Sequence, residues 1–151
     1  MQTLESKADR DSIAKRIAAL TPADQRRWGK MTVEQVVCHL CDSYRTALGE
    51  KAASSKTGFF QRTVMKWVAL RVPMKWPHGV QTMPEVEQGA GGTPPVEFER
   101  DRAMLVVLFD RFCEPKSNLA LAHPFFGPMS RDEWLRWGYL HADHHLRQFG
   151  R

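Results

Sequence analysis

TVEQVVCHLCDSYRTALG, residues 32–49, is the most clearly delimited helix signal in the chain. Thr32 and Gln35 have the spacing of a capping box, in which each side chain bonds a backbone N–H group that the first helical turn leaves without a partner. Gly49 stands where a helix commonly ends. Between these points apolar residues recur at intervals of three and four, which predicts an amphipathic helix with one buried face.

Apolar residues with helical spacing recur along most of the chain. They predict helices over four further segments, residues 6–20, 59–71, 93–112 and 131–149. We expect Thr93-Pro94 to start the third of these, and Ser130 and Glu133 form a second capping box before the last. Thr21-Pro22 predicts a short turn or helix, and no alternating strand pattern is evident. The sequence therefore predicts one all-α domain over residues 1–151, with four substantial amphipathic helices and a short one.

Residues 72–95 form a long segment rich in proline and glycine. A loop of this length in a small domain tends to be functional or disordered. We expect it to form, together with the HPFFGP loop at residues 123–128, the walls of a pocket.

Composition and charge narrow the classes of partner. The net charge of +5 suggests nucleic acid as a partner. The clusters of cations, however, are interleaved with acidic residues, as in residues 5–16 and 97–104. This pattern indicates a solvated surface and argues against nucleic-acid binding. The chain has no apolar run long enough to span a membrane, its N-terminus is polar, and its three cysteines suit a reducing compartment. We therefore expect a cytoplasmic protein without a membrane partner.

The last predicted helix carries His141, His144 and His145 within five positions. On a helical wheel His141 and His145 lie side by side at the edge of the apolar face, and His144 lies toward the charged face. His39 has nearly the same offset on its own helix. Two such edges can meet between neighbouring helices, and imidazoles one turn apart can bind one metal ion. The residues alone leave two interpretations open: a three-histidine metal site, or histidines hydrogen-bonded at helix edges.

Other side chains favour simpler interpretations. Cys38 and Cys41 form a C-x-x-C pattern, but both lie on the side of their helix away from His39, so we interpret them as ordinary cysteines. Gln148 suits either the cleft or a polar helix end. Trp134 and Trp137 are expected to pack in the core. His78 and His123 lie in proline-containing loops and are expected to be structural or exposed.

Three stretches together resemble the DinB-like superfamily. RWGKMTVEQVVCHLCDS, residues 27–43, resembles its second-helix signature, and HADHHLRQ, residues 141–148, resembles its final-helix motif of two histidines and a glutamine. AHPFFGPMSRDEWLRWGYLH, residues 122–141, looks like a subgroup of small bacterial proteins described as a domain of unknown function. The resemblance implies a four-helix bundle that binds a divalent metal through His39, His141 and His145. Zinc or nickel is expected first, with iron or manganese as alternatives.

Members of that superfamily include thiol-dependent S-transferases. The resemblance thus implies transfer to a low-molecular-weight thiol. A metal held by three imidazoles also keeps a position open for water, which is consistent with hydrolysis. We therefore expect a metal-dependent hydrolase or thiol S-transferase that acts on a small molecule. Gln148, Ser43 and Asp42 are candidates for a general base or a supporting group. The alternative is a non-catalytic metal-binding or stress-associated bundle, expected as a homodimer. In that case His123 or His144 would close the site as a fourth ligand.

Overall fold

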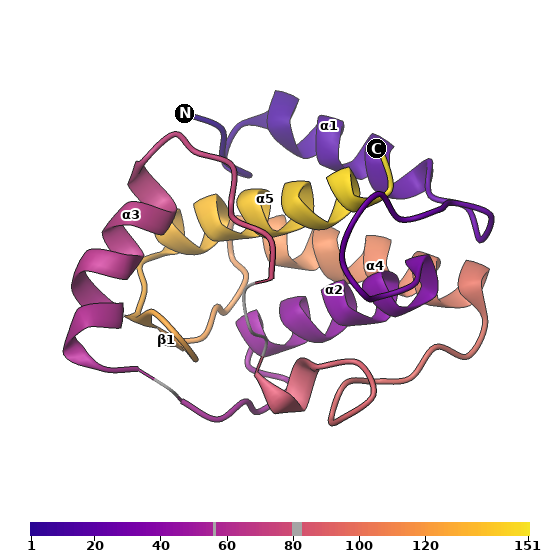
Figure 1. The fold of residues 1–151 in the computed structure, drawn as a ribbon. Helices are drawn as coiled ribbons and strands as arrows, with labels where there is room; N and C mark the ends of the chain where they lie inside the picture. Colours follow the sequence, from indigo (N-terminus) through magenta and orange to yellow (C-terminus); the bar gives the residue numbers. More distant parts are fainter. Residues whose placement is uncertain (56, 80–82) are drawn as a thin grey trace.

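The fold is mostly helical, and the computed structural model describes residues 1–55, 57–79 and 83–151 (Figure 1). In chain order the elements are α1 (Lys7–Ala18), α2 (Val33–Ala47), the π-helical turn η1 (Gln61–Met65), α3 (Lys66–Arg71), the 3₁₀ turn η2 (Pro84–Val86), α4 (Phe98–Cys113), the short strands β1 (Ala122–His123) and β2 (Gly127–Pro128), and α5 (Arg131–Gln148). Within these residues, every helix is too short or too polar to cross a membrane.

Both predicted capping boxes are present. At the start of α2 the Thr32 hydroxyl accepts from the Gln35 backbone N–H at 3.3 Å, and the Gln35 side chain accepts from the Thr32 N–H at 2.9 Å. Ser130 and Glu133 repeat this arrangement at the start of α5. Gly49 has φ of 75°, the left-handed conformation expected just beyond a helix end. The bounds of the two helices therefore follow from local backbone hydrogen bonding.

The long helices share one apolar core. α2 packs against α4 and α5, and α1 packs against the same two helices. In Figure 1, α5 crosses the middle of the molecule with α1 on one side and α2 on the other. Buried side chains from all four fill the space between them, including Ile13, Ile17, Val36, Leu40, Leu105, Phe109, Phe112, Trp134 and Leu146. This packing fixes the position of α2 relative to α5, on which the candidate site depends.

The predicted start of the fourth long segment is wrong. α4 begins at Phe98, where the Glu97 carboxylate accepts from the backbone N–H groups of Glu99 and Arg100. Thr93 instead donates its backbone N–H and its hydroxyl to Asp42, both at 2.7 Å. Pro94 and Pro95 explain the difference, because a residue before proline is driven out of the helical conformation.

Two smaller features, a π-helical turn and a pair of short strands, were not predicted from the sequence. The predicted helix over residues 59–71 is present, but it contains the π-helical turn η1 before α3. Residues 22–23 form a turn, which is one of the two outcomes predicted at Thr21-Pro22. β1 and β2, each two residues long, pair as an antiparallel hairpin, with Ala122 opposite Pro128 and His123 opposite Gly127. Strands of two residues are too short to produce an alternating pattern.

Candidate metal centre

Three histidines from α2 and α5 converge at one point. His141 Nε2 lies 3.3 Å from His39 Nε2 and 3.2 Å from His145 Nε2. One ligand atom from each of the three lies within 4.8 Å of the other two. Ligand nitrogens held 2.0–2.1 Å from a tetrahedral zinc ion are about 3.4 Å apart, so the two measured spacings suit a single small cation.

His39 is held in the orientation that a metal ligand requires. Its side chain is buried, 3% exposed, and its Nδ1 lies 2.9 Å from the backbone carbonyl oxygen of Val86 at the end of η2. A carbonyl oxygen can only accept, so Nδ1 carries the proton and Nε2 keeps its lone pair. That lone pair faces His141 and His145.

His145 has the same arrangement with a different partner. Its Nδ1 donates to Gln148 Oε1 at 2.8 Å, which leaves the Nε2 lone pair free. Gln148 is itself buried, and a Cβ atom on Gly29 would come within 2.6 Å of its amide nitrogen. The loop before α2 therefore approaches the amide closely at a glycine. Metal-binding histidines commonly have such a partner on the second ring nitrogen.

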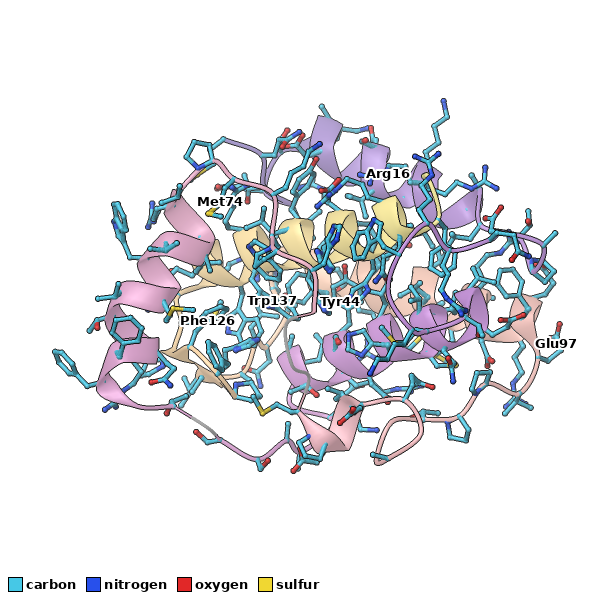
Figure 2. The ribbon with its side chains drawn as sticks, viewed as in Figure 1. Arg16, Tyr44, Met74, Glu97, Phe126 and Trp137 are labelled. Carbon is cyan, nitrogen blue, oxygen red and sulfur yellow. The ribbon has the colours of Figure 1, made fainter. Side chains whose placement is uncertain are left out.

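His141 completes the group and is the most accessible of its members. Its ring stacks on Trp137, with centroids 4.8 Å apart and planes at 19°, and Trp76 lies 6.3 Å away. Figure 2 shows Trp137 where α5 approaches α2, and the segment that carries Trp76 crosses α5 in Figure 1. His141 Nδ1 is buried and has no hydrogen-bond partner among the described residues. The two indoles form apolar walls around the partly exposed imidazole.

Burial keeps the three imidazoles neutral. It lowers the pKa of His39, and it lowers the pKa values of His141 and His145 well below the ordinary 6.5. The neighbouring histidines lower the pKa of His141 further, since two adjacent imidazolium ions repel. A neutral imidazole is the form that binds a metal, so the donor set fits a divalent ion such as zinc or nickel.

The structure places the candidate catalytic groups in different surroundings. Gln148 contacts His145, as described. Ser43 donates its hydroxyl to the His39 carbonyl oxygen at 2.8 Å, one turn back along α2. Asp42 is fully buried and accepts from Lys51 at 2.9 Å as well as from Thr93. The bonds between Thr93 and Asp42 attach the end of the long loop to α2. A catalytic role for Gln148, Ser43 or Asp42 stays a prediction.

The two other histidines of interest lie outside the converging group. The wheel placed His144 toward the charged face, but its side chain is only 8% exposed and packs edge-on against Trp28 at 4.8 Å. The segment before α2 covers this side of α5, which the wheel of one helix could not show. His123 accepts from the backbone N–H groups of Phe125 and Phe126, so it has a structural role in the hairpin.

Cys38 and Cys41 face α4. The Cys38 thiol lies 3.6 Å from the Asp101 carboxylate, and Cys41 lies 3.7 Å from the Asp101 carbonyl oxygen. Burial raises the pKa of both thiols to about 12, so they stay protonated and poorly suited to bind a metal. The geometry agrees with their interpretation as ordinary cysteines.

Sequence reasoning missed Val86 and Trp76, which both belong to residues 72–95. The proline and glycine content of that segment indicated a functional loop but no particular contact. Residues 80–82 of the same loop lie outside the described residues. In the part that is described, η2 packs against α2 and supplies the carbonyl group that orients His39.

Fold and site together define a class: a mostly helical protein with a mostly buried three-histidine cluster between two helices. The chain belongs to the family described as protein of unknown function (DUF1569), whose model matches residues 3–151. No curated protein and no solved structure matches the chain.

Proposed function

We propose that this chain is a DinB-like four-helix bundle that binds one divalent metal ion, zinc or nickel, through His39, His141 and His145. One observation carries the proposal: the Nε2 atoms converge at 3.2–3.3 Å from His141. The hydrogen bonds to Val86 and Gln148 support it, because they hold two of the three rings with their lone pairs toward the same point.

We further propose that the site is catalytic, with hydrolysis or transfer to a thiol as the reaction class. Among the described residues, the group of potential ligands contains three side chains, whereas a structural zinc site normally has four. A metal bound there would polarise a substrate oxygen or lower the pKa of a bound water or thiol. Trp76 and Trp137 would limit the access of bulk water beside His141, and Val86 and Gln148 would keep the imidazoles oriented.

The metal content of untagged protein tests the site. Elemental analysis should find about one equivalent in the wild type and much less in His39→Gln, His141→Gln and His145→Gln. His78→Gln is the matched control, since that imidazole is exposed and stacks on Trp28 outside the cluster. Equal metal content in all five proteins would refute the assignment.

Activity assays test the reaction class. Metal-loaded protein would be assayed with activated esters, and with low-molecular-weight thiols in the presence of an electrophile. We expect turnover in one of the two assays that His141→Gln abolishes and His78→Gln retains.

The burial of the cluster favours a second candidate, a metal-binding bundle without catalysis. His39 and His145 are 3% and 6% exposed, which suits a metal that links α2 to α5. Full metal content without turnover in either assay would favour this candidate over an enzyme.

A further inference from the structure

The helical segment over residues 59–71, and Met74 beyond it, leave six large apolar side chains exposed. Phe59 and Trp67 are 79% and 62% exposed, and the neighbouring exposed apolar side chains are Phe60, Val64, Met65 and Met74. Figure 1 shows this segment at one edge of the molecule, and Figure 2 places Met74 beside the C-terminal end of α3. We call these six residues the apolar edge. Exposed aromatic and aliphatic side chains gathered on one segment commonly mark an interaction site.

The charged residues of the sequence segment that carries the apolar edge are all of one sign. Residues 51–84 contain six Lys and Arg and no Asp or Glu, while the rest of the chain contains 16 cations and 17 acids. The net positive charge of the protein therefore resides in this segment. Elsewhere in the sequence cations alternate with acidic residues, but residues 51–84 contain cations alone.

Three of those cations are available to an external partner. Among the described residues, Lys51 pairs with Asp42 and Lys66 pairs with Glu133. Arg62, Arg71 and Lys75 are exposed, and no ion pair involves them in the described part of the chain. The hairpin beside η1 adds no charge, since residues 118–130 contain none.

We propose that the apolar edge docks on the surface of an anionic phospholipid bilayer. Exposed Trp and Phe side chains suit the boundary between headgroups and acyl chains, and Lys and Arg are attracted to anionic headgroups. A surface contact needs no spanning helix, so it differs from the membrane partner that the sequence argued against. This inference is independent of the metal site.

Charge and side-chain type favour a bilayer over two other partners. A symmetric contact with a second copy would bring the surface that carries Arg62, Arg71 and Lys75 against the same cationic surface of the other copy, and like charges repel. Single-stranded nucleic acid would use the cations and the aromatic rings. It would leave Val64, Met65 and Met74 without a stacking partner, whereas acyl chains accommodate them.

Vesicle sedimentation tests the proposal with the full chain. Wild-type protein should bind vesicles of phosphatidylcholine and phosphatidylserine, bind pure phosphatidylcholine weakly, and be released by high salt.

Phe60→Ser/Trp67→Ser should weaken binding about tenfold or more. Arg62→Gln/Arg71→Gln should weaken it about 25-fold, at roughly fivefold for each cation. Val107→Ser is the matched control, because Val107 is 51% exposed on α4, and it should bind as the wild type does.

Folding and insertion are checked separately. Circular dichroism and metal content should be the same in all variants. Trp67→Phe should keep vesicle binding but lose most of the blue shift in tryptophan fluorescence that binding produces, since Trp67 would enter the interface. Absence of binding to anionic vesicles at low salt would overturn the proposal. So would self-association, or retention on single-stranded nucleic acid in preference to vesicles, that the Phe60→Ser/Trp67→Ser variant abolishes.

Discussion

Gln148 holds His145 through a single hydrogen bond, and that bond decides which ring nitrogen keeps its lone pair. Gln148→Ala should therefore lower the metal affinity by about 10- to 100-fold, the usual effect of removing a partner of a metal-binding histidine. Competition with a chromophoric chelator measures the change. Gln148→Glu keeps an acceptor at this position and should retain the affinity. An alanine variant that binds metal as tightly as the wild type would show that the amide does not position His145.

His123 should make the stability of the fold depend on pH. Burial lowers its pKa from 6.5 to about 3, so below pH 6.5 the unfolded chain binds a proton that the folded chain does not. Its contribution to the free energy of unfolding is therefore lost as the pH falls from about 6.5 to about 3, by at most about 1.4 kcal/mol per pH unit.

His123→Asn tests this contribution, because an asparagine carbonyl can still accept from the Phe125 and Phe126 N–H groups. Urea unfolding of the metal-free protein between pH 4 and pH 7 should give a shallower pH dependence for the variant. Equal slopes in the two proteins would assign the acid sensitivity to other groups.

The sequence predicted which histidines converge because helical spacing fixes the direction of each side chain relative to the apolar face. His39, His141 and His145 all lie at the edge of such a face. The partners of their Nδ1 atoms were less accessible to this reasoning. The spacing within α5 left Gln148 either in the cleft or at a polar helix end, and the structure places it on His145. The Val86 carbonyl comes from a loop 47 residues away from His39, where no periodic pattern applies.

At the scale of the elements, Gly138 is the position in α5 where packing outweighs helix propensity. Alanine in a helix interior is normally about 1 kcal/mol better than glycine. Here a Cβ atom would come 2.6 Å from Phe112 Cε1 and 3.0 Å from Leu4 Cδ1, both on fully buried side chains. Gly138→Ala should therefore destabilise the protein by about 1–3 kcal/mol.

Thermal unfolding checks the sign of this change. Phe112→Leu should relieve the contact, so the double variant Phe112→Leu/Gly138→Ala should be less destabilised than the sum of the two single variants. A Gly138→Ala protein more stable than the wild type would contradict the close packing of α5 on α4.

Element bounds could be predicted where the signals are local. The two capping boxes gave the starts of α2 and α5 because each is formed by residues three apart. The start of α4 could not be predicted from Thr93, because the hydroxyl that was expected to cap the helix bonds Asp42, 51 residues earlier. Glu97, a less common capping residue, caps α4 in its place.

For the whole molecule, a metal bound between α2 and α5 would link these two helices in the folded state. Binding to the folded state alone stabilises a protein by about 2.7 kcal/mol when the free ligand is at 100 times its Kd. Added zinc should raise the Tm of chelator-treated wild-type protein, and a chelator should reverse the rise. His141→Gln should show neither effect. An equal zinc response in that variant would place the stabilising metal elsewhere.

The overall architecture was predictable to the level of a mostly helical fold, because the long helices have amphipathic spacing. How the long loop lies against α5 was not, since it depends on contacts such as that of Trp76 with His141 between distant parts of the chain. The apolar edge was also missed, because a helical pattern shows which residues share a face but not that the face is left uncovered.

X-ray absorption spectroscopy of the zinc-loaded protein tests the central claim most directly, because it reports the atoms bound to the metal. We predict nitrogen and oxygen ligands at about 2.0–2.1 Å, with the outer-shell scattering of three imidazoles and without sulfur. His39→Gln, where it still binds zinc, should show fewer imidazoles. Sulfur scattering at about 2.3 Å, which would implicate Cys38 or Cys41, or a coordination shell without imidazole, would contradict the account.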